Sequence, residues 1–290
     1  MAGSPEGAPC WVVAMLPDAA AGRRFYGELF GWTFVEPRPE TDADDVRADV
    51  RAGADVRADA GADRHGYTVA LLDGRPVAGL LAKPDGRMPT EWLLHLATED
   101  VTAAVGRVRA AGGQVMTEPF ALGDAGVTAV AADPGGAVFQ LWQPGLHDGF
   151  EARGEPGAYA WAEVFTRDAE AADAFYASVF GFGGTDLSAV LGEDYLMWTP
   201  RNELVDEEHA IGGRCLLDDR YPAEMPAHFR TYFAVRDCDE AVRTAERLGG
   251  RTLRGPEDSP YGRNALLVDN QGATFAVLTT EDAGDPDGAA

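Results

Sequence analysis

An internal repeat is the feature that most constrains how this chain can fold. Tryptophan, Phe-Tyr and Phe-Gly signatures occur twice, about 150 positions apart, as Trp11, Phe25-Tyr26 and Phe30-Gly31 and then as Trp161, Phe175-Tyr176 and Phe180-Gly181. A double glycine recurs in the same order, as Gly112-Gly113 and Gly249-Gly250. A repeat of this size predicts two similar structural units joined in one chain.

The two copies differ in length because the first contains a low-complexity segment. Residues 42–63 read DADDVRADVRAGADVRADAGAD and offer almost no large apolar side chain for packing. We expect this acidic insertion to be a flexible, solvated loop between two strands. The repeat then predicts a first module over 8–145, a polar linker rich in Gly and Pro over 146–157, and a second module over 158–280.

Charge limits the kinds of partner. The chain has 290 residues, of which 46% are hydrophobic, enough for a buried core in each copy, and its net charge is −24. Nucleic acid and anionic membranes would be repelled, so neither is expected as a partner. A neutral or cationic small molecule fits better, although the acid excess could also serve solubility alone.

Cysteine usage and the N-terminus indicate a soluble cytoplasmic protein. Cys10, Cys215 and Cys238 are odd in number and show no CxxC spacing, which argues against a disulfide framework and a thiolate zinc site. The first ten residues lack the basic and apolar regions of a signal peptide, and no apolar run is long enough to cross a bilayer.

The same order of elements is predicted in each copy. Alternating apolar strands precede helices that begin at Asp18, Asp100, Asp168 and Asp237. In the first copy, two strands flank a predicted hairpin turn at Asp73-Gly74, and 114–120 is predicted to be a further strand. Each copy therefore reads as two βαβββ units, four in all, in an α+β fold with helices on one face of mixed sheets.

Several of these segments resemble the vicinal oxygen chelate superfamily, which includes glyoxalase I, extradiol dioxygenases, fosfomycin resistance enzymes and bleomycin-binding proteins. The resemblance rests on FYGELFGW at 25–32, FYASVFGF at 175–182, the helices over 100–113 and 237–250, and the closing segments 133–145 and 269–278. It covers roughly 8–280 and implies cup-shaped mixed sheets that hold a ligand. Tandem members encoded beside anthracycline enzymes, such as those for daunorubicin and doxorubicin, look most similar.

The metal ligands that this resemblance implies are missing. The family holds a divalent metal with His, Gln or Glu, and the corresponding positions are Trp11, Leu93 and Gln140 in the first cup and Trp161, Arg230 and Ala276 in the second. Indole, isobutyl and guanidinium groups supply no donor for such a metal. Only Gln140 could coordinate, so we expect no metal site and no cofactor.

Other polar residues are candidates for a binding or catalytic role. Strand alternation places His95 on the Leu93 face of the first cup, where a lone histidine is more often a wall residue than a base. In the second cup, Trp161, Glu163 and Phe165 share one strand face, as do Arg230 and Tyr232 on a neighbouring strand. Glu163 and Arg230 form either a structural ion pair or ligand contacts, and Glu163, His95 and Tyr232 are the candidate catalytic residues.

Aromatic side chains favour a flat ligand. Trp11, Trp142 and Trp161 fall on predicted cup-facing positions, where large rings suit stacking on a polycyclic compound. The alternative is that rings such as Trp92 and Phe25 only fill the cores. An indole at a metal-ligand position either plugs a cup or forms its floor.

The leading hypothesis is a metal-free protein that binds an aromatic polyketide of anthracycline type, for sequestration, self-resistance or support of a late tailoring step. The alternative is a metal-independent biosynthetic enzyme: an isomerase, cyclase, hydrolase or cofactor-free oxygenase. A third hypothesis is that the tandem module binds a biosynthetic tailoring enzyme directly. Metal-dependent glyoxalase or dioxygenase activity is not expected.

Overall fold

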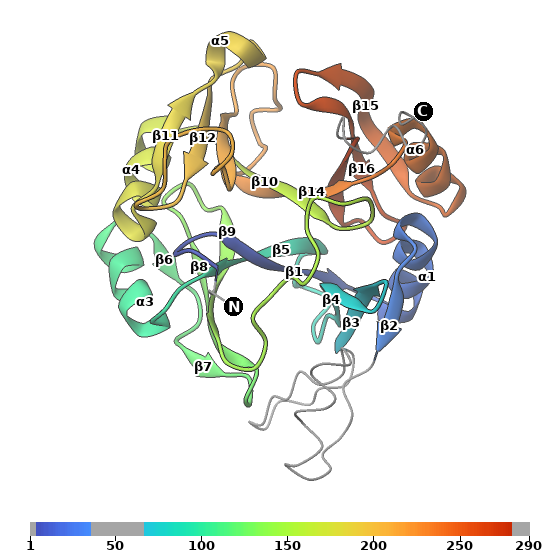
Figure 1. The fold of residues 1–290 in the computed structure, drawn as a ribbon, viewed down its shortest axis with the longest axis horizontal. Coiled ribbons are helices and arrows are strands. Elements are labelled where there is room, and N and C mark those ends of the chain that lie inside the picture. Colours follow the sequence, from blue (N-terminus) through green and yellow to red (C-terminus); the bar gives the residue numbers. More distant parts are fainter. Residues whose placement is uncertain (1–3, 36–66, 280–290) are drawn as a thin grey trace, which may run out of the picture.

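The computed structural model describes residues 4–35 and 67–279 and contains two mixed β-sheets with helices (Figure 1). The insertion expected at 42–63 lies outside the described residues. The first sheet has the order β2-β3-β4-β1-β5-β9-β8-β6, with β7 paired to β8. Its elements are β1 (Pro9–Leu16), α1 (Ala19–Phe30), β2 (Thr33–Val35), β3 (Tyr67–Leu72), β4 (Arg75–Ala82), β5 (Glu91–Ala97), α3 (Val101–Ala110), β6 (Gln114–Val115), β7 (Phe120–Ala121), β8 (Gly126–Ala132) and β9 (Val138–Pro144).

The second sheet repeats this arrangement with the order β11-β12-β13-β10-β14-β17-β16-β15. Its elements are β10 (Tyr159–Thr166), α4 (Ala169–Phe180), β11 (Gly183–Asp186), α5 (Ser188–Leu191), β12 (Tyr195–Thr199), β13 (Gly212–Leu216), β14 (His228–Ala234), α6 (Cys238–Arg247), β15 (Arg251–Ser259), β16 (Gly262–Val268) and β17 (Thr274–Thr279). The fold is therefore α+β and is built from four βαβββ units, as the sequence predicts.

The helix starts are set by aspartates. In each of the four longer helices the residue before the first turn accepts a backbone N–H through its side chain, at Asp18, Asp100, Asp168 and Asp237. These contacts satisfy donors that the first turn of a helix leaves free. Gly31 and Gly181 end α1 and α4 with φ of 74° and 79°, a left-handed conformation that glycine adopts without strain.

Two predictions for the first sheet have different outcomes. The hairpin turn at Asp73-Gly74 is confirmed, with φ of 50° and 78° at its two residues, as a tight two-residue turn requires. The single strand predicted over 114–120 forms only at its ends, as β6 at Gln114–Val115 and at Phe120 where β7 begins, because the chain bulges between them. Met116 and Thr117 both donate their N–H to the Val130 carbonyl, and Pro119, which has no N–H, precedes β7.

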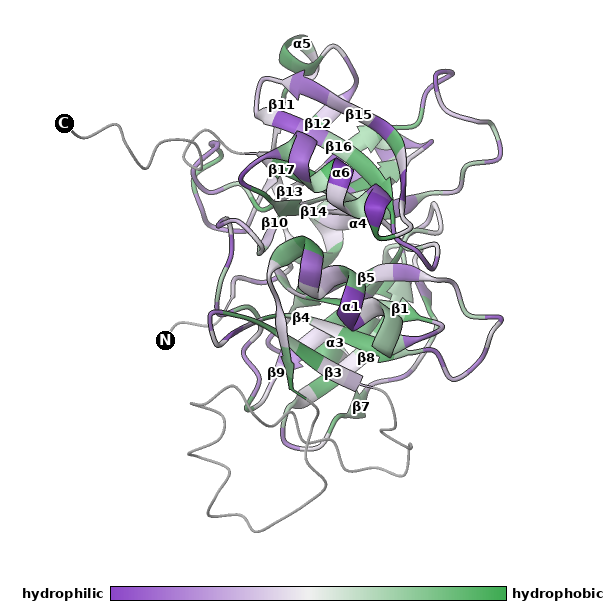
Figure 2. Cartoon of the chain, turned by 90° about the vertical axis from the view of Figure 1, so that its right-hand side faces the viewer, coloured by the Kyte–Doolittle hydropathy of each residue, from purple (hydrophilic) through white to green (hydrophobic). Residues whose placement is uncertain are grey.

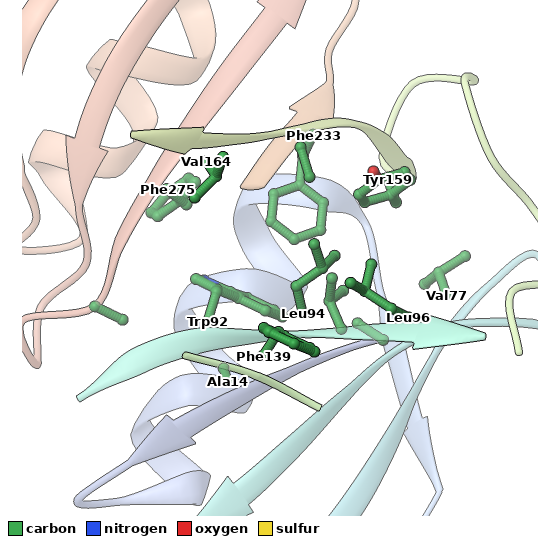
Figure 3. Packing of buried hydrophobic residues seen from close by; sticks show 14 of the residues in the cluster. Ala14, Val77, Trp92, Leu94, Leu96, Phe139, Tyr159, Val164, Phe233 and Phe275 are labelled. Atoms are coloured by element: carbon green, nitrogen blue, oxygen red, sulfur yellow. The ribbon is translucent and has the colours of Figure 1, made fainter. Parts of the chain in front are cut away.

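The two sheets pack face to face through one shared apolar core. Figure 3 shows Phe233 of β14 pointing from the second sheet towards Trp92 of the first, and their ring centroids lie 4.9 Å apart. Phe25 and Trp92 belong to this core, at 1% and 4% exposure, so both rings are core residues. The cup-forming faces of the sheets therefore point outwards, in opposite directions.

Buried hydrogen bonds tie the helices of one copy to the closing turns of the other. The Tyr26 hydroxyl on α1 donates to Asp269, which precedes β17, at 2.8 Å. The Tyr176 hydroxyl on α4 donates to Asp133, which precedes β9, at 3.1 Å. Helix α1 accordingly packs beside α6, and α3 packs beside α4. The two copies thus share a core and a reciprocal pair of polar contacts.

Hydropathy follows this arrangement. Figure 2 shows hydrophobic residues along strands such as β1 and β8, whereas the edge strands β11 and β15 and helix α6 carry many hydrophilic residues. Among residues 4–35 and 67–279, the longest helices have 12 residues, and none is long and apolar enough to cross a membrane.

We expect Tyr176→Phe to lower the free energy of unfolding by about 1–2 kcal/mol, since it leaves the buried Asp133 carboxyl without its hydroxyl partner. Tyr26→Phe should cost at least as much, since the Tyr26 hydroxyl also accepts the Trp92 indole N–H at 3.0 Å. Urea denaturation measures both values. Tyr261→Phe, at a tyrosine that is 40% exposed, is the control. Equal stability of all three variants would show that the crossed contacts contribute nothing.

Candidate functional site

Strand register makes the two cups directly comparable. In the first sheet Trp11 lies opposite His95 and Val13 opposite Leu93. In the second, Trp161 lies opposite Tyr232 and Glu163 opposite Arg230. Equivalent positions therefore carry Trp11 and Trp161, Val13 and Glu163, Leu93 and Arg230, and His95 and Tyr232.

The first cup is filled by side chains of the chain itself. Trp11 and Trp142 are only 2% and 3% exposed. The His147 ring meets Trp11 edge-on at 4.5 Å, and Phe150 lies 5.5 Å from the same indole. The Trp142 indole N–H donates to the His147 carbonyl at 3.0 Å. The segment after β9, which the sequence marks only as linker, therefore covers the first cup, and Trp11 plugs it.

The other residues predicted for this cup share its surface. His95 lies opposite Gln140 in the β5–β9 pair, and Leu93 is on the same face as His95. His95 is 4% exposed, and its Nδ1 lies 3.3 Å from the Leu93 carbonyl. Burial lowers the pKa of His95 to about 3. A ring held neutral in this way suits a wall residue rather than a base at neutral pH.

The second cup contains a cavity of about 670 Å³, within the usual range of about 300–1,000 Å³ for small-molecule sites. Strands β11 and β12 and helix α5 rise on one side of β10 and β14, and the β15–β16 hairpin rises on the other (Figure 1). Aromatic and apolar side chains supply much of the lining, including Trp161, Phe165, Tyr195, Met197, Tyr221 and Leu278. Met197 on β12, Leu278 on β17 and Tyr221 in the loop after β13 were not predicted as site residues, because only the folded sheet and this loop bring them together.

A repeated tryptophan–tyrosine contact fixes the indole on this surface. The Trp161 indole N–H donates to the Tyr195 hydroxyl at 3.0 Å. Tyr195 lies across Gly213, where an added Cβ would sit 2.3 Å from that hydroxyl, so β13 needs a glycine there. The first cup has the same contact in Trp11, Tyr67 and Gly79. In the second cup, however, the indole is partly exposed and lines the cavity.

Three polar groups form a chain on the cavity wall. The Tyr232 hydroxyl donates to Glu163 Oε2 at 2.6 Å, and Arg230 Nη1 lies 3.5 Å from the Tyr232 oxygen. The Arg230 guanidinium also lies 3.8 Å from the centroid of the Phe165 ring. Within the part of the chain that the structure describes, no direct ion pair joins Glu163 to Arg230. Tyr232 stands between them, so the simple ion pair considered from the sequence is not formed.

Burial controls the protonation of this group. Desolvation raises the pKa of Glu163, and the positive charge of Arg230 and the hydroxyls of Tyr232 and Tyr195 oppose that rise only in part. Burial and the nearby Glu163 charge raise the pKa values of Tyr195 and Tyr232. The site therefore offers one carboxyl whose raised pKa favours its protonated form, two neutral phenols and one cation.

The residues present do not fit a divalent metal. Arg230 lies directly opposite Glu163, and a guanidinium supplies charge of the wrong sign and no donor lone pair. In the described ranges, no three His, Cys, Asp or Glu side chains come close enough together to hold an ion. The first cup likewise presents Trp11, Leu93 and Gln140.

We expect His147→Phe to reduce the loss of stability in acid. Burial lowers the pKa of His147 from 6.5 to about 4, so the folded state binds a proton less readily than the unfolded chain. The contribution of neutral His147 to stability is therefore fully present above pH 6.5 and is lost as the pH drops towards 4. The fall in Tm between pH 7.5 and pH 5 should be smaller in the variant. His209→Phe is the control, because Asp206 raises the pKa of His209 and its loss cannot relieve acid sensitivity.

Glu163→Gln should have the opposite pH dependence. The pKa of Glu163 is raised from 4.5, so the folded state holds this proton more tightly than the unfolded chain does. The contribution of protonated Glu163 to stability is therefore lost as the pH rises from 4.5 through the raised pKa. The Tm of the variant relative to the wild type should therefore increase between pH 4.5 and pH 8. Glu207→Gln, at an exposed residue that lines the same cup, controls for the loss of one negative charge. A constant Tm difference in Glu163→Gln would contradict the burial argument.

Comparisons with known proteins agree with this architecture. A model of the Glyoxalase/Bleomycin resistance protein/Dioxygenase superfamily matches residues 11–141. "Putative glyoxylase CFP32" of Mycobacterium tuberculosis is 34% identical over 277 residues, covering 94% of this chain and 95% of that protein. "Anthracycline biosynthesis protein DnrV" of Streptomyces peucetius is 34% identical over 286 residues, covering 94% and 93%.

A solved structure extends the likeness in fold to both modules. The Mn(II)-bound glyoxalase from Novosphingobium aromaticivorans matches with a TM-score of 0.60 and 16% identity, over 95% of this chain and 83% of that one. At this identity the match concerns the fold alone. Taken with the relatives that span nearly the whole sequence, it shows that the chain belongs to the glyoxalase/bleomycin resistance protein/dioxygenase superfamily, also called vicinal oxygen chelate.

Proposed function

We propose that the second cup binds a planar aromatic natural product of anthracycline type without the help of a metal. The observation that carries this proposal is the cavity of about 670 Å³ lined by aromatic rings, with a polar group of Glu163, Tyr232 and Arg230 on one wall. Rings on a concave surface stack on flat ligands, and a few fixed polar groups orient them.

The charge of the cup suits a ligand that carries an amino group. Five acidic and three basic side chains line the cavity: Glu163, Glu193, Glu207, Glu257 and Asp258, and Arg220, Arg230 and Arg254. Glu207, Glu257 and Asp258 are exposed, but Glu257 pairs with Arg254 at 2.9 Å and Asp258 with Arg263 at 3.0 Å, which leaves Glu207 as the exposed acid that would attract a cation. The net charge of −24 acts in the same direction at longer range.

The relatives favour the same class of ligand. DnrV carries an anthracycline biosynthesis name, and it aligns with this chain over nearly the full length of both proteins. Binding of this kind would sequester the product, protect the producing cell from it, or support a late tailoring step beside a tailoring enzyme.

A second candidate function is a metal-independent enzyme acting on a similar compound. It is favoured by the 2.6 Å Tyr232–Glu163 hydrogen bond and by the raised pKa of Glu163, because a carboxyl that can accept and return a proton beside a bound ligand is a group that a proton-transferring isomerase or cyclase uses. A hydrolase or cofactor-free oxygenase would use the same residues. Mass spectrometry can monitor the conversion of an anthracycline precursor. Conversion by the wild type that is abolished in Glu163→Gln would support this function. An unchanged precursor would leave binding as the activity.

Equilibrium dialysis with doxorubicin in the presence of chelator tests the binding proposal. We expect saturable binding with one site per chain and a Kd on the order of micromolar. Trp161→Leu should weaken it by about tenfold, because it removes a ring from the cavity wall. Trp11→Leu, the same change at the equivalent position of the filled cup, should alter Kd by less than about twofold. No binding, or equal loss in the two variants, would refute the assignment to the second cup.

A further inference from the structure

Arg230 is buried without the partners that a buried arginine normally has. Its side chain is on the cavity wall and the residue is 5% exposed, yet Nε has no hydrogen-bond partner within the described chain. Its one hydrogen bond, from Nη1 to Tyr232, is long at 3.5 Å. A guanidinium has five N–H donors, and a buried charge that lacks acceptors is costly. The described residues place no carboxylate within ion-pair distance of it.

Arg214, also 5% exposed and in the same sheet, shows how this chain satisfies a buried guanidinium elsewhere. Its Nη2 and Nε donate to Asp173 at 2.9 and 3.1 Å, and Nη1 donates to the Asp194 carbonyl and carboxylate. The free donors of Arg230 are therefore a local property of the second cup.

The fold itself does not require an arginine at this position. Leu93 occupies the equivalent site in the first sheet, opposite Val13, and the strand pairing there is the same. The arginine is also held in one orientation, since its guanidinium stacks on Phe165, and Phe165 stacks on His228 at 5.2 Å. The fork of donors is thus fixed before any ligand arrives.

The neighbouring hydrogen bonds leave these donors free for a ligand. Tyr232 commits its proton to Glu163, so its oxygen can accept from only part of the Arg230 fork. The remaining N–H groups match the in-plane oxygen atoms of a carboxylate or an ionised phenol.

We propose that Arg230 is the receptor for an oxyanion carried by the aromatic ligand of the second cup, a carboxylate or an ionised phenol. The proposal rests on the proposed function, because it names the chemistry recognised in the same cavity. It also gives the ligand a direction: the oxyanion end lies at the wall formed by β10 and β14, and any amino group lies towards the acidic rim.

Two probes of similar shape test it: anthraquinone-2-carboxylate and the neutral 2-(hydroxymethyl)anthraquinone. In wild-type protein, equilibrium dialysis should give a Kd about tenfold lower for the carboxylate. Arg230→Met, which keeps the length of the side chain, should bring the two Kd values together and leave the neutral probe within about threefold of wild type. Arg230→Lys should restore part of the preference, because it restores the charge but not the fork.

Arg254→Met is the matched control. Arg254 also lines the cavity, but it is exposed and already pairs with Glu257 at 2.9 Å, so its loss should not change the preference. Binding of 2-hydroxyanthraquinone, measured at pH values below and above the pKa of its phenol, distinguishes recognition of a phenolate from recognition of a carboxylate.

The possible failures are distinguishable. If wild type binds both probes equally, or if Arg230→Met keeps the preference for the carboxylate, the oxyanion receptor is refuted while aromatic binding stands. If wild type binds neither probe and no anthracycline, the proposed function fails as well.

Discussion

The apolar layer between the two sheets determines which face of each sheet remains available to form a cup. Because Phe233 and Trp92 meet across it, the inner faces of both sheets are used for packing and only the outer faces are left as cups. The crossed hydrogen bonds of Tyr26 with Asp269 and of Tyr176 with Asp133 place polar partners within this layer. Neither copy could expose its inner face to water without a large loss of hydrophobic stabilisation.

Most of the fold could be predicted from the sequence because it depends on local signals. The repeat, the four aspartate caps and the Asp73-Gly74 turn each act over a few residues. Strands β2 and β11 could not be predicted in this way, since β2 has only three residues and β11 reads Gly-Gly-Thr-Asp, without apolar alternation. The 114–120 segment looks like a strand, but its pairing depends on β8, which a local pattern does not describe.

The candidate site could be predicted only in part, for a related reason. Strand alternation places Trp161 and Glu163 on one face, and the register agrees. The bridging position of Tyr232 depends on side-chain rotamers, and the filling of the first cup depends on how His147 and Phe150 fold back after β9. A segment rich in Asp, Gly and Glu gives no sign that it will cover a tryptophan.

The shared register of the two sheets has a consequence for how such a duplicated protein can change. Along β1 and β10, residues that face the other sheet, such as Val12 and Ala162, are apolar in both copies, whereas the outward pair Val13 and Glu163 differs in polarity. Successive residues of one strand are thus under different constraints: the inward residues pack in the core that both copies share, and the outward residues determine the chemistry of the cup. A single substitution at an outward position such as 13 or 163 can give one half of the molecule a new chemical character while the shared core, built from residues such as Val12 and Ala162, is left in place.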